Sequence, residues 1–120
     1  MEKPHKKLDV WRQSMQLASR IYRATELLPD TEKYGLISQM RRAAVSVPCN
    51  IAEGAARKSN NEFRHFLSIA RGSLSELDTQ LDLCQELNLM SSHARREFDE
   101  QLMRIDKMLY ALHQMKTTIG

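Results

Sequence analysis

The sequence has few of the residues that break or reverse a chain. Its 120 residues include four Gly, three Pro and two Cys. So few turn formers argue against a many-stranded β fold. No apolar run approaches the roughly 18 residues of a membrane-spanning helix, and the basic start lacks the apolar stretch of a secretory signal. We therefore expect one soluble domain over residues 1–120 with a flexible N-terminal tail at residues 1–7, and no membrane partner.

The sequence also has little of what catalysis needs. Cys49 and Cys84 show no motif spacing, so we interpret them as small core residues with free thiols in a reducing cytoplasm. No Gly-rich loop is present to cradle a phosphate. A di-iron bundle needs two Glu-x-x-His pairs on core helices. One lies at Glu62 and His65, but the other, Glu2 and His5, falls in the tail. We predict no enzyme, no cofactor and no metal.

Four segments show the spacing of apolar residues that is typical of helices. They cover about residues 8–28, 32–57, 63–84 and 93–115. In the third, seven apolar residues follow a 4, 3, 4, 3, 4, 3 spacing without a slip, from Phe63 to Cys84. The connections are short, and short connections make successive helices antiparallel neighbours. The pattern predicts an all-α fold, an antiparallel up-down-up-down four-helix bundle with long helices.

Several residues within these segments predict local features. Pro48 lies inside the second segment, where it removes a backbone donor, so we expect helix 2 to be kinked there. Asn50 can bond backbone groups freed by that bend. Ser59 and Glu62 form a capping-box pattern before the third helix, and Ser91 or Ser92 is expected to cap the fourth. Gly54 and Gly72 predict a close approach of helices 2 and 3.

The charges are unevenly distributed along the chain. Residues 1–71 carry thirteen Lys and Arg against seven Asp and Glu, whereas residues 72–120 carry five against eight. Two interpretations stay open. The basic side chains could attract phosphates, or the charges could pair between neighbouring helices, with the acidic end of helix 3 beside Arg95 and Arg96. Glu53 could pair with Arg57 or with Arg71. The positive excess is densest at Arg41, Arg42, Arg57, Lys58, Arg64 and Arg71.

The first helix carries more apolar surface than one bundle needs. Leu8, Trp11, Met15, Ala18 and Tyr22 form one stripe, and a second, offset stripe runs from Val10 to Leu28. The fourth helix has an extra edge of Met108, Met115 and Ile119. Surplus apolar surface on long helices indicates a subunit interface, so the pattern favours an oligomer.

One stretch resembles a known family. Residues 39–54, QMRRAAVSVPCNIAEG, resemble the signature of the four-helix-bundle proteins encoded by intervening sequences in bacterial 23S rRNA genes. Shorter runs at residues 7–11, 66–73 and 75–81 match the same family. The resemblance implies an antiparallel bundle that assembles as a homopentamer. The family is also similar to the accessory protein of diversity-generating retroelements, a basic pentamer that binds nucleic acid and a reverse transcriptase.

These observations lead to one expectation and one alternative. We expect a non-enzymatic homo-oligomeric scaffold, pentameric by resemblance, that binds rRNA or another nucleic acid through a basic surface of the six residues Arg41, Arg42, Arg57, Lys58, Arg64 and Arg71. The alternative is a protein–protein adaptor whose basic face meets an acidic partner protein.

Overall fold

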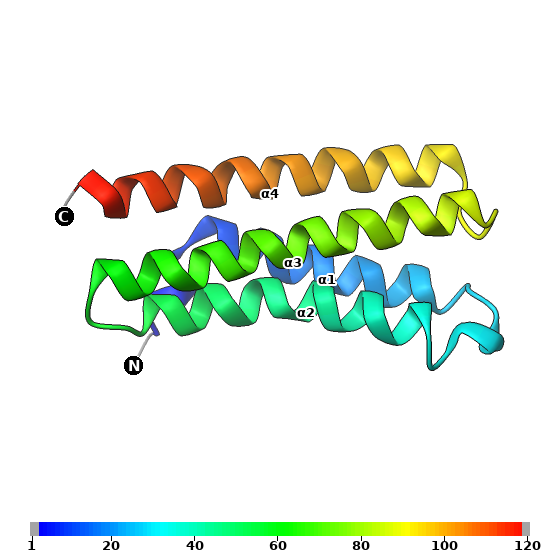
Figure 1. Ribbon diagram of the computed structural model, residues 1–120, viewed down its shortest axis with the longest axis horizontal. Helices are drawn as coiled ribbons and strands as arrows, with labels where there is room; N and C mark the ends of the chain where they lie inside the picture. The colour runs from blue at the N-terminus through cyan, green and yellow to red at the C-terminus, as the bar shows by residue number, and fades with distance from the viewer. Residues whose placement is uncertain (1–2, 119–120) are drawn as a thin grey trace.

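The computed structural model describes residues 3–118, and its helices run along one long axis (Figure 1). The elements are two 3-10 helices, η1 (Pro4–Lys7) and η2 (Asp30–Glu32), and four α-helices, α1 (Asp9–Thr25), α2 (Leu36–Ala55), α3 (Asn60–Glu86) and α4 (Ser92–Thr118). The described residues contain no strand. The molecule measures 46 × 25 × 19 Å. The predicted four-helix fold is confirmed.

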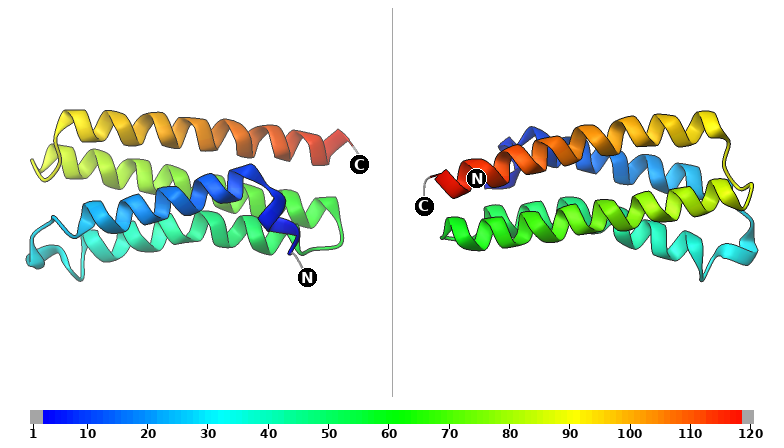
Figure 2. Two further views of the ribbon diagram at one scale, coloured as in Figure 1. Left: turned by 180° about the vertical axis from the view of Figure 1, so that it is seen from behind. Right: turned by 45° about the horizontal axis from the view of Figure 1, so that its top comes forward.

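Each helix packs against the helices before and after it, and α1 also contacts α4 (Figures 1 and 2). The antiparallel order gives the rod two distinct ends. One end holds the start of α1, the α2–α3 turn and the end of α4. The other holds the connection from α1 to α2, which includes η2, and the turn between α3 and α4. No helix of the described residues is both long and apolar enough to cross a membrane.

The core forms where the sequence periodicity places it. All seven residues of the predicted stripe on α3 are buried, from Phe63 to Cys84. Fully burying a Leu or Ile side chain contributes about 1.5–3 kcal/mol, so these stripes supply most of the packing energy. On α1 the core is formed mainly by the second stripe, joined by Ala18 of the first. Met15 and Tyr22 of the first stripe stay 47% and 42% exposed, which leaves apolar surface on the outside.

Two helix boundaries differ from the prediction for local reasons. Helix α1 ends at Thr25, where the side-chain Oγ1 donates to the carbonyl oxygen of Ile21 at 2.7 Å. Helix α2 begins only at Leu36, because residues 30–32 form η2. Helix α3 ends at Glu86, and Asn88, just after the C-cap Leu87, adopts the left-handed region (φ 59°), with the N–H of Leu89 donating to the carbonyl oxygen of Cys84 at 2.8 Å. That 6→1 bond is a Schellman motif.

Helix α2 continues through Pro48 without a break in its helical assignment. Asn50 Nδ2 donates to the carbonyl oxygen of Ser46 at 2.8 Å and to Ser46 Oγ at 2.9 Å. The carbonyl that Pro48 leaves without its helical donor is that of Ala44, so the predicted compensation by Asn50 stays a prediction. Ser46 Oγ in turn lies 2.7 Å from Ser73 Oγ on α3. These contacts tie the middle of α2 to α3, while the bend at Pro48 stays a prediction.

The glycines within α2 and α3 differ in their surroundings. A Cβ on Gly54 would lie 2.9 Å from both Phe63 Cδ1 and Phe66 Cβ, which confirms the close approach of α2 and α3. A Cβ on Gly72 would meet no atom within 4 Å, so the predicted close approach there is wrong. The contact with α2 is made one residue later, by Ser73, and Gly72 lines an open groove between α3 and α4.

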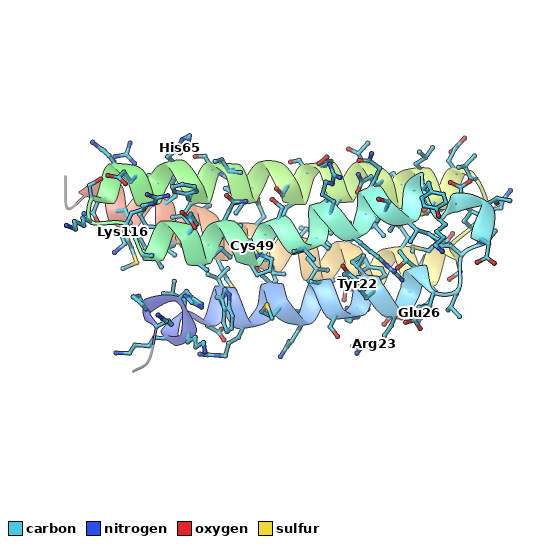
Figure 3. All side chains as sticks on the ribbon, turned by 90° about the horizontal axis from the view of Figure 1, so that it is seen from below. Tyr22, Arg23, Glu26, Cys49, His65 and Lys116 are labelled. Atoms are coloured by element: carbon cyan, nitrogen blue, oxygen red, sulfur yellow. The ribbon has the colours of Figure 1, made fainter. Side chains whose placement is uncertain are left out.

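The two cysteines also differ. Cys84 is buried, with its Sγ 3.5 Å from Met40 Sδ, and burial raises the pKa of its thiol. Cys49 is exposed, so its assignment to the core is wrong. The residues that face inward here are Val47 and Pro48, which leaves the next residue on the outer surface of α2 (Figure 3).

The N-terminal segment has a defined conformation in its described part. Pro4–Lys7 forms η1, which contacts α2, and the His5 ring meets the Trp11 ring edge-on at 4.9 Å between centroids. Residues 1 and 2 lie outside the described residues, and so does Ile119, which was expected to widen the apolar edge of α4. The flexibility of the tail stays a prediction.

Candidate nucleic-acid interface

Cations gather at the end of the bundle that holds the α2–α3 turn. We define this basic end as residues 3–12, 53–66 and 110–118, which the antiparallel topology brings together (Figures 1 and 2). The basic end contains three carboxylates, Asp9, Glu53 and Glu62. Its Lys and Arg residues are eight, namely Lys3, Lys6, Lys7, Arg12, Arg57, Lys58, Arg64 and Lys116. The local field is therefore positive.

The α2–α3 turn holds its cations on a fixed backbone. Ser59 caps α3 as predicted, because its Oγ accepts from the N–H of Glu62 at 3.1 Å. Arg57 pairs with Glu53 and lies over the ring of Phe66, 5.0 Å from the centroid. The structure thus selects Arg57 as the partner of Glu53. Lys58 is exposed and has no ion-pair partner among residues 3–118.

The first turns of α3 and the end of α4 add two more cations. Arg64 Nη1 donates to Asn61 Oδ1 at 3.0 Å, and Arg64 Nε is buried without a hydrogen-bond partner in the described residues. Lys116 Nζ lies 5.1 Å from the centroid of the Phe63 ring. Figure 3 shows Lys116 and His65 near the same end of the rod. The rings of Phe63 and Phe66 are thus covered by cations, whereas Tyr110 stays 50% exposed with the guanidinium of Arg71 5.2 Å from its ring centroid.

The N-terminal segment places further lysines beside the turn. Helix η1 contacts α2, and Lys3, Lys6 and Lys7 are exposed. Arg12 fixes this segment, since its Nη1 donates to the carbonyl oxygen of Lys6 at 3.1 Å and its Nη2 lies 3.3 Å from Asp9 Oδ1. The Arg12–Asp9 pair therefore neutralises one of the eight cations of the basic end. The three lysines have no ion-pair partner among the described residues.

The structure brings together three of the six residues predicted for the interface. Arg57, Lys58 and Arg64 lie at the basic end. Arg41 and Arg42 lie about 24 Å farther along α2, since 16 residues separate Arg41 from Arg57 and each rises about 1.5 Å. Arg71 lies on the side of α3 that faces α4. The six residues therefore do not form one continuous surface.

Two of the remaining three hold helices together. Arg71 makes a two-pronged pair with Asp106 of α4, at 2.9 Å from Nε and 3.3 Å from Nη2, and the hydrogen bond raises the pKa of Arg71. Arg41 Nε donates to Thr25 Oγ1 at 2.9 Å, and its Nη2 donates to the Tyr22 carbonyl oxygen at 3.2 Å. Charge pairing between helices thus explains Arg71, whereas Arg41 is held by neutral hydrogen-bond acceptors at the end of α1. Arg42 is exposed.

The acidic half of α3 is matched by α4, as one of the two interpretations predicted. Arg95 pairs with Asp78 and with Asp82 Oδ1 at 2.9 Å, and its side chain is 9% exposed. Burial opposes the charge of Arg95, but the hydrogen bonds to Asp78 and Asp82 outweigh it and raise its pKa. Arg96 is exposed and makes no ion pair among residues 3–118.

The Glu62 and His65 pair does not converge on a common point. The backbone N–H of Glu62 donates to the N-cap Ser59, while the His65 ring packs edge-on against Phe66, 5.4 Å between centroids. Across residues 3–118, no three His, Cys, Asp or Glu side chains gather so that they could hold a metal ion.

The sequence reasoning missed five cations of the basic end, namely Lys3, Lys6, Lys7, Arg12 and Lys116. Both signals needed to find them were in the sequence. The start of the chain is visibly Lys-rich, and an up-down-up-down order places that start and the end of the fourth helix beside the α2–α3 turn.

Comparison with known proteins supports the fold. The chain is similar to a protein of unknown function from the S23 ribosomal protein family of Bacteroides thetaiotaomicron, with 22% identity over 88% of this chain and 95% of that chain, and a TM-score of 0.81. No protein of curated function matches. The family model described as 23S rRNA-intervening sequence protein matches residues 6–111. The chain therefore belongs to the 23S rRNA-intervening sequence protein family.

Proposed function

We propose that this protein is a non-enzymatic homo-oligomeric scaffold that binds nucleic acid, preferably RNA, through its basic end. The observation that carries the proposal is the excess of eight Lys and Arg residues over three carboxylates at one end of the rod. Four of these cations, Lys3, Lys6, Lys7 and Lys58, are exposed and have no ion-pair partner among residues 3–118. Unpaired surface cations are the groups that replace counterions on a phosphate backbone.

The chemistry predicts binding that depends little on sequence. The basic end offers point charges rather than a groove with base-edge donors, and phosphate contacts position a nucleic acid without specifying its bases. Phe63 and Phe66 lie under Lys116 and Arg57, so they leave little open ring surface for base stacking. Affinity should therefore fall steeply with salt.

Assembly would multiply this weak attraction. The exposed apolar residues Met15 and Tyr22 on α1 support an oligomer, and the family resemblance specifies a pentamer. Several basic ends on one particle bind one RNA with an avidity far above that of a single end. The family description refers to 23S rRNA, which makes a structured 23S rRNA fragment the natural probe.

The test is fluorescence anisotropy of a labelled, structured 23S rRNA fragment at about 50 and 200 mM salt. The triple variant Lys6→Glu, Lys7→Glu, Lys58→Glu should bind at least about tenfold more weakly and show a shallower salt slope. The matched control, Arg23→Glu, Arg96→Glu, Arg104→Glu, makes the same charge change at exposed positions away from the basic end and should bind more tightly than the first variant. Equal losses in the two triples, or no binding by the unmodified protein at low salt, would remove the proposal.

The oligomer is tested separately by light scattering. A pentamer has five times the 13.9 kDa mass of the chain. A stable single-chain particle at all working concentrations would contradict the assembly part of the proposal and leave the RNA titration to decide the rest.

A protein–protein adaptor is the second candidate, and one observation favours it. Leu27 and Tyr34, near the opposite end, are 88% and 89% exposed, and apolar surface of this kind marks a protein interaction site where it is contiguous. The adaptor predicts weak RNA affinity together with stoichiometric co-purification of one acidic protein.

A further inference from the structure

A cationic groove lies between α1 and α2 at the end opposite the basic end. It has a volume of about 670 Å³, and its walls include Tyr22, Lys33, Tyr34, Arg41, Arg42 and Val45. Figure 3 shows Tyr22 between the two helices. No Asp or Glu is among the residues that line it, although Glu26, Asp30 and Glu32 are close in sequence. The groove combines three cations with exposed rings and an apolar wall.

Contacts within the chain hold the side chains of the groove in place. Arg41 is fixed by Thr25 and the Tyr22 carbonyl, and its guanidinium lies 4.5 Å from the centroid of the Tyr22 ring. Lys33 Nζ lies 5.7 Å from the Tyr34 ring centroid. Arg42 is exposed and pairs with no carboxylate among residues 3–118. A partner that binds the groove would therefore contact side chains already held in place, together with the free guanidinium of Arg42.

The outer face of α3 has the complementary character. Residues 72–94 contain four Asp and Glu and no Lys or Arg. Asp78 and Asp82 are taken by Arg95, whereas Glu76 and Glu86 make no ion pair within the described chain. Beside them, Leu83 and Leu87 are 46% and 51% exposed. Residues 76, 83 and 87 share one side of the helix, since their spacings are close to whole numbers of turns. We call Glu76, Leu83 and Leu87, together with Glu86 at the edge beside Leu83, the α3 strip.

The groove and the α3 strip lie at the same height along the rod. Ser46 contacts Ser73, and Met40 contacts Cys84, so residues 40–46 of α2 are level with residues 73–84 of α3. The two surfaces also have similar lengths. At about 1.5 Å per residue, α2 from residue 36 to 46 spans about 15 Å and α3 from residue 76 to 87 spans about 17 Å.

We propose that the groove of one copy receives the α3 strip of a second copy, with Arg42 facing the glutamates and Tyr34 and Val45 facing the leucines. This inference rests on the oligomer of the proposed function and deepens it. Charge complementarity selects a second copy as the occupant, because the strip is acidic and apolar where the groove is cationic and apolar. The contact is head to tail, since it joins two different surfaces of the chain.

The shared height has a consequence for function. A rotation about an axis parallel to the rod brings the groove of one copy onto the strip of the next without tilting either, and repeated contacts of this kind close into a ring. All copies then point the same way. Their basic ends lie on one side of the ring, where they act together on one nucleic acid. An end-to-end or antiparallel assembly would separate them.

The experiment uses two variants that each damage one surface. The groove variant is Arg42→Glu, and the strip variant is Leu83→Asp with Leu87→Asp. All three residues are exposed, and circular dichroism checks that both variants stay helical. Tyr34→Asp and Glu76→Lys with Glu86→Lys replace them if either is unfolded. Arg104→Glu, an exposed change on α4 outside both surfaces, is the control and should assemble like the unmodified chain.

Light scattering should show that each variant alone is a single chain. An equimolar mixture should form a 1:1 dimer, because the intact strip of the groove variant fits the intact groove of the strip variant and the two damaged surfaces cannot close a ring. Assembly of either variant like the unmodified chain overturns the inference. A mixture that stays single-chain also overturns it, because a two-fold contact between identical surfaces gives that result.

The inference can fail independently of the proposed function. Arg42→Glu leaves all eight cations of the basic end in place, so its RNA titration reports that end without assembly. An assembled Arg42→Glu protein that binds RNA normally removes the groove contact and leaves the proposed function standing. If light scattering shows that the unmodified protein is a monomer at all concentrations, both the groove contact and the oligomer are wrong. RNA binding is then judged from the basic-end variants alone.

Discussion

The two ends of the rod carry similar numbers of cations but use them differently. The basic end has eight Lys and Arg against three carboxylates, whereas residues 20–42 and 76–100 at the opposite end have seven against ten. At the opposite end Arg95 is enclosed by aspartates, Arg20 bonds Gln101 and Arg41 caps the end of α1. At the basic end Lys3, Lys6, Lys7 and Lys58 are exposed and have no ion-pair partner among residues 3–118. Exposed cations without an ion pair in the part of the chain that the structure describes occur at both ends, Arg42 and Arg96 among them, so the surplus of cations over carboxylates is what distinguishes the basic end.

The largest contrast in stability should separate Arg95 from Arg57. Arg95→Ala leaves Asp78 and Asp82 close together without their cation, and we expect a loss of about 2–4 kcal/mol, which is below the full cost of breaking a deeply buried pair because both aspartates are partly exposed. Arg57→Ala removes a surface pair and should change the free energy of unfolding by less than about 1 kcal/mol. Urea unfolding measures both. Equal losses would show that pairing does not distinguish the two ends.

The two glycines sharpen the same contrast through packing. Gly54→Ala would place a Cβ 2.9 Å from Phe63 and Phe66, and the nearby Phe63 carbonyl at 3.3 Å is backbone that cannot swing away, so we expect a loss of about 1–3 kcal/mol. Gly72→Ala meets no atom within 4 Å in a helix interior and should stabilise by about 0.5–1 kcal/mol. Thermal unfolding shows whether Gly54→Ala lowers the stability and Gly72→Ala raises it. A stabilising Gly54→Ala would contradict the close contact that holds the basic end in shape.

The sequence predicted the helices well because buried stripes follow the helical repeat, as on α3 from Phe63 to Cys84. It predicted the site less well. Density of Arg along the chain grouped Arg41 and Arg71 with Arg57, but side chains 16 residues apart on a helix are far apart, and neighbouring helices supplied Thr25 and Asp106 as partners. Which cations are paired depends on how each helix is rotated about its own axis relative to its neighbours. The spacing of apolar residues determines that rotation only to within about one residue. The errors at Gly72 and Cys49 have the same cause.

The buried thiol near the opposite end predicts a dependence on pH. Burial raises the pKa of Cys84 above its ordinary value of 9.0. The folded state therefore binds the proton more tightly than the unfolded chain. The resulting stability is fully present below the unfolded pKa and is lost as pH rises through the raised folded value. Cys84→Ala should destabilise the protein at pH 7, because it leaves a cavity in the core. Chemical unfolding at pH 7 and pH 10 should show that this loss of unfolding free energy is smaller at pH 10.

Cys49→Ala is the matched control, because that thiol is exposed. Its difference from the unmodified chain should be the same at both pH values. A constant difference for Cys84→Ala as well would show that the buried thiol does not titrate differently in the folded state.

The smallest expected effect is at Asn88, which lies just after the C-cap of α3 with φ at 59°. Asn tolerates the left-handed region better than most residues, but Gly adopts it without steric cost, so Asn88→Gly should stabilise by up to about 0.5–1 kcal/mol. Asn88→Val, with a branched Cβ, should destabilise instead. Urea midpoints of the two variants decide the sign. Because this turn lies far from the basic end, RNA affinity should stay unchanged in both, and a change in affinity would mean that the two ends of the rod are coupled after all.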